Sequence, residues 1–515
     1  MNRRLVMTMT AMSMGVIVIA MDITAMNVAL SAIERAFDSD VTETLWVING
    51  YLLAFGMLIV TGGRLSDIFG KRRLFFVGLF LFGVTSLAGG LAPTLWLLVV
   101  ARILQGMGGA LLWPAILGIS YLAVPEEKRG LAVGIILGAA ALGNALGPVI
   151  GGILTELVSW RCVLLVNVPM ACFAGLITLT QVTPDQAGKT KERIDYPGIL
   201  SLSVALAAVM LAIDEAGIWG WLSSPIIILL IIGALFFAGF TVTERRVGYP
   251  VVPHDVMSNK TFLVACIITG LMAPSIFANF FYLPQYMEKF LHFSTLRSGV
   301  GILPMLVTFA CVSPFAGNLY NRLGGRLLVI VGAVCMAVGT FLFSLLAVNS
   351  GYTGMIPGMI IFGAGLGVGI ASITTVAVGA LDVSKTGLAG GLTYMFQLSV
   401  GSLGLAFTTM IYIVSGDSRV LQQLIALGTD LSGPQRHLLR GILTGTDSAR
   451  QLLSQFDGET ARRLAAVVQE RYVLGLRDAL LFDAILAGIA ALLAIIFIRG
   501  GRTKETAGQR GNIAA

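Results

Sequence analysis

Charged residues are scarce in this chain of 515 residues: aspartate, glutamate, lysine and arginine together make up only 12% of it. Hydrophobic residues make up 56%. This composition excludes an ordinary soluble domain, because such domains need many more charged residues to cover their surface. It indicates a protein that crosses a membrane many times.

Cysteine is also rare, and the five cysteines lie in apolar runs without the spacing of a metal site. We interpret them as small core residues, not as disulfides or ligands. No small-residue cleavage site interrupts the first apolar run, so we expect no cleavable signal peptide. No pattern of a nucleophile and base, a metal cluster or a phosphate-binding loop supports an enzyme, and we expect no cofactor.

Fourteen apolar runs are long enough, at about 20 residues each, to span a bilayer as helices. An even number of spans places both ends of the chain on the same side. The runs cover residues 5–32, 44–62, 73–91, 95–117, 131–155, 160–181, 197–213, 225–243, 261–287, 299–319, 327–348, 354–378, 388–414 and 477–499.

Basic residues predict which side of the membrane the ends occupy. If both termini are cytoplasmic, the short outside loops hold only Arg35, Lys289 and Arg297, and the other loop lysines and arginines lie inside. This is the asymmetry that the positive-inside rule describes. The net charge of +7 therefore reflects membrane orientation, and no nucleic-acid partner is expected.

The fifth run carries glycines four residues apart and a proline. A stripe of small side chains lets another helix approach backbone to backbone, and a proline bends the helix beside it. We expect this helix to shape the crossing between two halves of the molecule. The residues concerned are Gly143, Gly147, Pro148, Gly151 and Gly152.

A single carboxylate, Asp22, lies inside the first apolar run. An acid within a membrane helix costs about 3 kcal/mol on insertion scales, so it persists where it faces a polar cavity. Such an acid can carry a proton or pair with a cationic substrate, but not both at once, and an antiporter needs that exclusion. The alternative is a structural aspartate that caps a break or pairs permanently with a neighbour.

The fourth run contains Arg102, about 10 Å along the helix from its start, and Gln105 on the same face. Arg102 either snorkels to the outer interface or lies near Asp22. In the second case it would favour the charged form of that acid and compete with the proton.

A basic turn at residues 63–74 joins the second and third runs, and residues 317–328 repeat five of its twelve positions. The second copy has Asn321 where the first has an acid. The repeat predicts two six-helix halves with two helices inserted between them. The turn residues that we single out are Gly63, Asp67, Gly70 and Arg72. The expected units are 1–183, 184–255 with the inserted helices, 256–500 and a tail at 501–515.

These motifs resemble those of the fourteen-helix drug/proton antiporter family of the major facilitator superfamily. The matching segments are the run around Asp22, the basic turn, R-x-x-Q-G at 102–106, G-x-x-x-G-P-x-x-G-G at 143–152, and the Trp160–Pro169 segment, where Leu164 replaces the usual Phe. The resemblance implies an all-α membrane fold of two six-helix bundles plus two helices. It also implies that Asp22 is linked to transport, Arg102 to proton transfer, and Asp67 to a latch between the halves.

Aromatic and amide side chains within the apolar runs are candidates for a cargo cavity, although those near residue 280 could equally form an interface belt. They are Asn27, Tyr51, Gln105, Trp113, Asn279, Phe281, Tyr282, Gln285, Tyr394 and Gln397. Asp483, in the last run, is a second candidate for proton coupling, and it matches no motif.

Residues 415–476 are too polar to span a membrane, yet their leucines fall near helical spacing. We expect an external amphipathic hairpin that lies over the exit or on the lipid surface. Its role could be gating, partner docking or passive covering.

The sequence thus predicts a monomeric, multi-pass transporter of a bacterial cell membrane. It would export small lipophilic, cationic compounds in exchange for protons, with the proton gradient as its energy source. A lipid flippase of the same fold is the alternative, and a membrane sensor that transports nothing is a third interpretation.

Overall fold

The computed structural model describes residues 3–185, 194–426 and 458–498. Every secondary-structure element in these ranges is helical. Fourteen stretches of helix among the described residues are long and apolar enough to cross a membrane. This confirms the all-α membrane fold that composition and run length predict.

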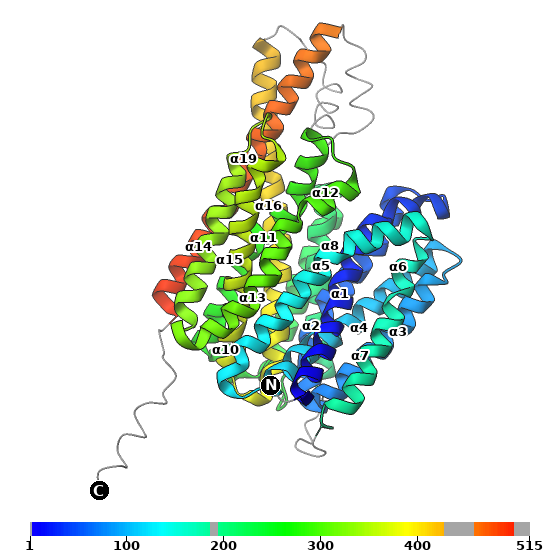
Figure 1. The fold of residues 1–515 in the computed structure, drawn as a ribbon, viewed down its shortest axis with the longest axis vertical. Helices are drawn as coiled ribbons and strands as arrows, with labels where there is room; N and C mark the ends of the chain where they lie inside the picture. Colours follow the sequence, from blue (N-terminus) through cyan, green and yellow to red (C-terminus); the bar gives the residue numbers. More distant parts are fainter. Residues whose placement is uncertain (1–2, 186–193, 427–457, 499–515) are drawn as a thin grey trace.

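The first half of the molecule holds six of these spans, and Figure 1 shows them on one side of the molecule. Its helices are α1 (Arg3–Phe37), α2 (Val41–Phe69), α3 (Lys71–Gly90), α4 (Leu95–Leu122), α5 (Arg129–Leu157), α6 (Arg161–Leu165) and α7 (Asn167–Gln181), with a short 3-10 turn, η1 (Glu126–Lys128), before α5. In this half α1 packs against α5, and α4 packs against both α2 and α3.

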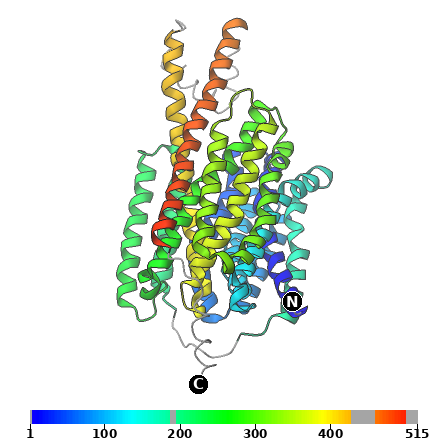
Figure 2. The ribbon, with the colours of Figure 1, turned by 60° about the vertical axis from the view of Figure 1, so that its left-hand side comes forward.

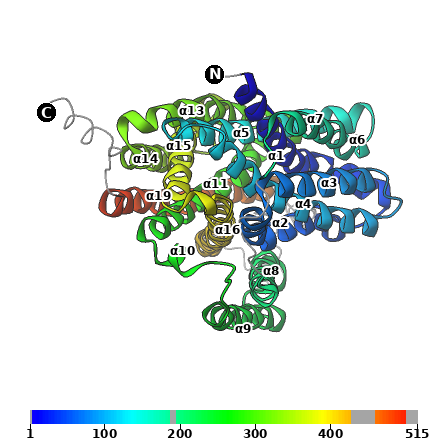
Figure 3. The ribbon, with the colours of Figure 1, turned by 90° about the horizontal axis from the view of Figure 1, so that it is seen from below.

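Two inserted helices, α8 (Tyr196–Trp219) and α9 (Ser224–Arg246), form a hairpin at the edge of the molecule. Seen from below in Figure 3, α8 lies beside α2 and α16, and α9 lies farther out. Helix α8 contacts one helix from each half. The pair therefore covers a seam between the halves.

The second half holds the remaining six spans. Its helices are α10 (His254–Ser258), α11 (Lys260–Phe290), α12 (Thr295–Gly301), α13 (Leu303–Leu323), α14 (Gly325–Ser344), α15 (Tyr352–Gly379), α16 (Thr386–Ala426) and α19 (Gly458–Phe497), with a 3-10 turn, η2 (Val383–Lys385), before α16. Helices α5 and α13 pack against each other across the halves, as do α2 and α16.

Two corresponding turns reflect the sequence repeat. Gly70 joins α2 to α3 with φ +103°, and Gly324 joins α13 to α14 with φ +82°. Residues other than glycine rarely adopt such angles. The repeated glycine therefore allows an abrupt start of the third span in each half. Both turns lie at the end of the molecule where α1 begins, which is the lower end in Figure 1.

Two of the predicted runs form broken helices. The sixth run is split at Val166, between α6 and α7, and the tenth is split at Ile302, between α12 and α13. Pro169 and Pro304 follow these breaks closely. A proline lacks the amide hydrogen for the helical bond and clashes with the carbonyl four residues earlier, which explains both interruptions.

The structure describes only the two ends of the expected external hairpin. Helix α16 continues to Ala426, past a span that ends at Ser415, and α19 begins at Gly458, before a span that starts at Tyr472. Figures 1 and 2 show both extensions projecting from the upper end. Hydropathy falls where the chain leaves the lipid, whereas the helical hydrogen bonds continue. The rest of the predicted hairpin, 427–457, lies outside the described residues.

Candidate functional site

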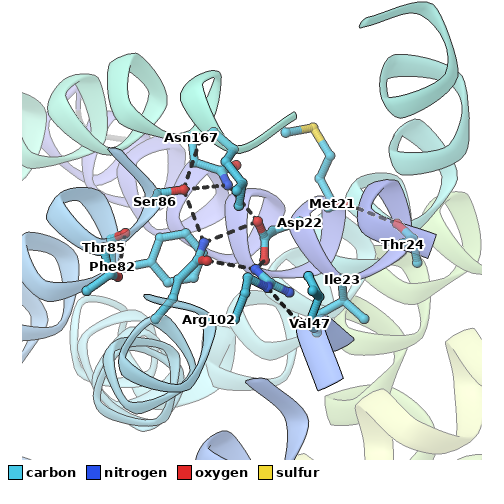
Figure 4. A network of polar contacts seen from close by, with 12 residues as sticks. Met21, Asp22, Ile23, Thr24, Val47, Phe82, Thr85, Ser86, Arg102 and Asn167 are labelled. Carbon is cyan, nitrogen blue, oxygen red and sulfur yellow. Dashed lines mark hydrogen bonds and ion pairs between the residues drawn. The ribbon is translucent and has the colours of Figure 1, made fainter. Parts of the chain in front are cut away.

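Asp22 lies at the centre of a buried polar network between helices α1, α3, α4 and α7 (Figure 4). Its Oδ2 accepts a hydrogen bond from Nη1 of Arg102 at 2.5 Å. Its Oδ1 accepts from Nδ2 of Asn167 at 2.7 Å and from Nε2 of Gln105 at 3.2 Å. The acid and arginine that the sequence analysis selected therefore form an ion pair.

The ion pair is fully enclosed: Asp22 is 0% exposed and Arg102 is 1% exposed. Arg102 also donates from Nε to the carbonyl of Val47 at 2.9 Å and from Nη1 to Oε1 of Gln105 at 2.7 Å. Its guanidinium lies 4.4 Å from the ring centroid of Tyr51. Burial of two charges is tolerated only when hydrogen bonds satisfy both partners, as they do here.

This geometry decides between the two alternatives for Arg102 and differs from the open cavity expected at Asp22. Arg102 does not snorkel to the interface, because its charge meets a carboxylate inside the bundle. Asp22 does not face an open cavity in this conformation, because both of its oxygens are held by N–H donors. A proton that reaches Asp22 therefore competes first with Arg102, and a cationic cargo would have to replace that arginine.

The sequence analysis missed two members of the network. Ser86 on α3 accepts hydrogen bonds from Gln105 and Asn167 at 3.2 and 3.1 Å, and it donates to the carbonyl of Leu164 at 2.9 Å. Asn167 stands in the recognised segment from Trp160 to Pro169, and that position was a usable signal. Ser86 lies in an apolar run without any motif, so no signal was available.

Aromatic side chains connect this network to the other half of the molecule. The Tyr51 ring stacks on Phe55 with centroids 6.0 Å apart, and Phe55 meets Tyr394 of α16 edge-on at 5.8 Å. Trp113 of α4 contacts the same Tyr394 at 4.4 Å. The hydroxyl of Tyr51 and Nε1 of Trp113 are buried, and neither has a hydrogen-bond partner within residues 3–185, 194–426 and 458–498. Three predicted cavity residues therefore meet at the boundary between the halves.

Six further cavity candidates take no part in the aromatic contacts that the structure describes at this boundary. Asn279 donates to Thr340 within the second half at 2.9 Å. Tyr282 shares a hydrogen bond of 2.8 Å with Thr409, and Phe281 is 47% exposed beside it. The remaining three are Asn27, exposed on α1, Gln285, which accepts from Lys289, and the half-buried Gln397.

Asp67 joins the two halves at the lower end. Its Oδ1 accepts hydrogen bonds from Nζ of Lys71 at 2.8 Å and from the amide of Gly387 at 3.0 Å. Its Oδ2 accepts from the amide of Leu388 at 2.8 Å. These amides open helix α16, where the first N–H groups lack helical partners and attract an anion. A Cβ added at Gly63 would come within 3.0 Å of the Leu388 Cα, so the two backbones are in contact here.

The basic turn after Gly70 is fixed by a second acid. The Asp185 carboxylate accepts from the backbone amides of Arg72 and Arg73 at 3.2 and 2.9 Å. The Arg72 side chain donates from Nη2 to the carbonyl of Leu179 at 3.0 Å. These bonds hold the start of α3 against the segment that follows α7.

The glycine stripe of α5 faces α1 within the same half. A Cβ added at Gly143 would lie 2.8 Å from the carbonyl oxygen of Ile17, and one at Gly151 would lie 2.8 Å from that of Ala25. Gly147 lies between them and is equally close to α1. These three glycines therefore pack within the first half, and the contacts of this helix with the second half come from other residues.

The adjacent face of α5 makes that crossing. Pro148 lies against Gly299 of α12, where an added Cβ would be 3.0 Å away, and a Cβ at Gly152 would be 2.8 Å from Cδ1 of Leu296. Helix α5 also packs along α13. Residues 148 and 152 each follow a stripe glycine by one position, which turns them about 100° around the helix.

Asp483 is not part of the Asp22 network. It lies on α19 in the second half and is 0% exposed. The distance from its Oδ1 to Oγ1 of Thr408 is 2.8 Å. In the described part of the chain, its Oδ2 has no hydrogen-bond partner. The two acids that the sequence analysis selected for proton coupling are therefore separate sites.

Comparison with known proteins places this architecture in a family. Residues 12–405 match the Major Facilitator Superfamily. The tetracenomycin C resistance and export protein of Streptomyces glaucescens is 33% identical over 78% of this chain and 74% of its own. The multidrug resistance protein Stp of Mycobacterium tuberculosis is 29% identical over 98% of this chain and 92% of its own.

Solved structures agree on the fold. The human organic anion transporter MFSD10 superposes with a TM-score of 0.62 at 12% identity, over 96% of this chain and 100% of its own. The proton:xylose symporter XylE superposes with a TM-score of 0.58 at 14% identity, over 96% of each chain. With its fourteen spans and its relatives among drug resistance proteins, the chain fits the expected resemblance. It belongs to the Major Facilitator Superfamily of membrane transporters.

Proposed function

We propose that this transporter exports lipophilic compounds, cationic ones included, in exchange for protons by alternating access. The relatives named for resistance and export support the direction and the class of cargo. The observation that carries proton coupling is the enclosed ion pair between Asp22 and Arg102, which lies next to the aromatic contact between the halves.

The ion pair couples to protons through competition. Every hydrogen bond that the structure describes at the Asp22 carboxylate comes from an N–H donor, so these partners suit the ionised acid. A proton on Asp22 removes the charge that holds Arg102. Arg102 would then be a buried cation without a counter-charge, a condition that costs several kcal/mol. The bundle relieves that cost by moving Arg102 toward water.

The aromatic cluster offers a way for that movement to reach the other half. Arg102 lies over the Tyr51 ring, Tyr51 stacks on Phe55, and Phe55 contacts Tyr394 of α16. A displaced guanidinium loses its cation–π contact and frees Tyr51 to shift. Since Tyr394 belongs to the opposite half, the shift alters the packing between the halves.

The same cluster is the proposed cargo surface. Aromatic faces bind flat lipophilic molecules, and they attract cations as well. The partnerless hydroxyl of Tyr51 and Nε1 of Trp113 are available to bind polar atoms of the cargo. A few polar groups within an apolar surface are typical of small-molecule sites.

The distribution of basic residues supports an orientation with both termini in the cytoplasm of a bacterial cell. We propose that the chain acts as a monomer. In this orientation the lower end is cytoplasmic. Asp67 closes that end by binding the start of α16, as a latch would in a state that faces outward. Release of this latch would let the transporter turn inward.

The test is transport by purified protein in liposomes with an imposed pH gradient. Asp22→Asn should abolish efflux of a fluorescent lipophilic cation driven by the gradient, because the variant can neither bind nor release the proton. Asp38→Asn is the matched control, because Asp38 is exposed just beyond the end of α1, and it should keep wild-type efflux. Full gradient-driven efflux by the Asp22 variant would contradict the proposal. A parallel assay with a fluorescent phospholipid distinguishes a flippase.

A further inference from the structure

A second buried carboxyl, Asp483, lies deep in the last span. It is the twelfth residue of the stretch Tyr472–Phe497, so it lies about 17 Å along the helix from its upper end. The side chain is fully buried between α19 and α16. No ion pair holds it among the residues that the structure describes.

The hydrogen atoms around Asp483 can be counted. Oγ1 of Thr408 lies 2.8 Å from the carbonyl oxygen of Gly404 and 2.8 Å from Oδ1 of Asp483. A threonine hydroxyl has one hydrogen, and a carbonyl oxygen can only accept. With Thr408 as the donor to both oxygens, its one hydrogen is shared between them. Thr408 therefore offers an ionised Asp483 at most a shared hydrogen, whereas a protonated Asp483 would supply its own hydrogen to Thr408 and leave the threonine hydrogen to Gly404.

The surroundings of the other oxygen of Asp483 also favour the protonated acid. Oδ2 is buried and has no hydrogen-bond partner among the residues that the structure describes. An ionised carboxylate would leave half of its charge there without a donor, at a cost of several kcal/mol. In a neutral acid the same atom is a carbonyl oxygen, and an unpaired carbonyl oxygen costs much less.

The helices around Asp483 supply no compensating cation in the described part of the chain. On α11, the nearby titratable group is Tyr282, whose hydroxyl bonds to Thr409. On α16 it is Tyr412, which contacts Tyr282 at 5.6 Å. On α14, Arg326 donates to the carbonyl of Ile495, three turns below Asp483, and Cys335 carries no positive charge. On α19 itself, Arg477 is exposed and Tyr472 lies near the upper end.

We infer that Asp483 is a second proton-binding site, separate from Asp22 and occupied by a proton in this conformation. A cavity of about 460 Å³ lies between α8 and α16, and its lining includes Asp214, Ser402 and Thr409, the residue after Thr408. This cavity therefore lies across helix α16 from the carboxyl. The role of this proton in exchange rests on the proposed antiport, whereas its presence on Asp483 does not.

The experiment is infrared spectroscopy of the full-length protein in liposomes near neutral pH. The carbonyl stretch of a protonated carboxyl group should be present in the wild type, lost in Asp483→Asn and retained in Asp22→Asn. Asp478→Asn, a half-buried site on the same helix, is the matched control and should leave the band unchanged. An Asp483→Asn spectrum that is identical to wild type would overturn the inference.

A second variant keeps Asp483 and changes only its hydrogen bond. Thr408→Val removes the acceptor of the acid's hydrogen, so the band should persist and move to higher wavenumber. An unmoved band in this variant would also overturn the inference.

Transport then tests the coupling role separately. In liposomes that carry out antiport, Asp483→Asn should lower the number of protons exchanged per cargo molecule by one. An unchanged proton-to-cargo ratio would overturn the coupling role of Asp483. If no cargo is exchanged for protons even by the wild type, the antiport proposal fails, and the infrared result still decides whether Asp483 holds a proton.

Discussion

The two halves of the molecule each enclose an aspartate in a spanning helix, and they hold it with different neighbours. Asp22 contacts a guanidinium and two side-chain amides, all of which donate to it. Asp483 contacts one hydroxyl that already has an acceptor in the carbonyl of Gly404. Both acids are 0% exposed.

The comparison teaches that burial alone does not determine the charge of an acid in a membrane protein. Desolvation acts on both residues, but the donors around Asp22 offset it, and Asp483 has no such set of donors. The neighbours therefore give one half an ionised acid in an ion pair and the other, by our inference, a neutral acid.

The largest effect should come from a change that gives Asp22 the surroundings of Asp483. Arg102→Met leaves the carboxylate without a counter-charge, and removing one partner of a buried pair costs about 3–5 kcal/mol. We expect the free energy of unfolding in detergent to fall by that amount. We also expect transport to be lost and a new infrared band from protonated Asp22 to appear.

Arg161→Met is the control for this prediction. Arg161 stacks on the Trp160 ring at 4.4 Å and donates to the carbonyls of Gly90 and Ala92, so its loss leaves no acid unpaired. The double variant Asp22→Asn, Arg102→Met should recover part of the lost stability. Equal destabilisation by the two single arginine variants would show that the counter-charge is not what matters.

An intermediate effect is expected at Asp67, which is held partly by a lysine and partly by backbone amides. Asp67→Asn removes the charge that binds the start of α16, and the lost charge-assisted bonds are worth about 1–3 kcal/mol. The lower ends should therefore separate in a larger fraction of molecules. Spin labels on cysteines at positions 127 and 321, which contact each other across the halves, would measure this separation.

Glu126→Gln is the matched control for the latch. Glu126 is exposed at the same end and pairs only with Arg129 of its own half, at 3.7 Å. The distance distribution should stay as in the wild type. If the two variants separated the lower ends equally, Asp67 would have no special role in closing them.

The smallest effect is expected at an exposed ion pair, the opposite extreme from Asp22. The Lys385 ammonium donates to Asp255 and lowers the pKa of that carboxyl. The contribution to stability is therefore full above the ordinary pKa of aspartate and is lost as the pH falls through the lowered one. Because Asp255 is 63% exposed, Lys385→Ala should cost only about 0.2–1 kcal/mol, and less in high salt. A larger loss, or one that salt does not reduce, would contradict this assignment.

Much of the site was predictable from sequence because membrane burial makes polar residues conspicuous. An acid and an arginine in two apolar runs have few ways to be satisfied, and pairing is one of them. The turn with Gly70 and Asp67 was predictable for another reason. The glycine allows the abrupt turn, and the resemblance to the family implies the contact that the acid makes with the other half.

Other parts required the structure because they depend on how helices face one another. Ser86 and Phe55 lie in apolar runs, and nothing in the sequence indicates that one contacts Gln105 and the other Tyr394. The stripe of α5 was recognised, but its partner was not, because small side chains permit close packing without selecting the neighbour. The shared hydrogen of Thr408 beside Asp483 can be recognised only from two distances in the structure.

Helix α16 is a single unbroken helix of 41 residues, about 60 Å long, that runs through the second half. It begins on the Asp67 latch, passes Tyr394 and Thr408, and continues beyond the membrane. A stiff lever of this kind cannot tilt at one point alone. In the orientation that we propose, a pull on the projecting arm would therefore be felt at the Asp67 contact on the cytoplasmic side, and opening that contact would swing the arm outside the cell.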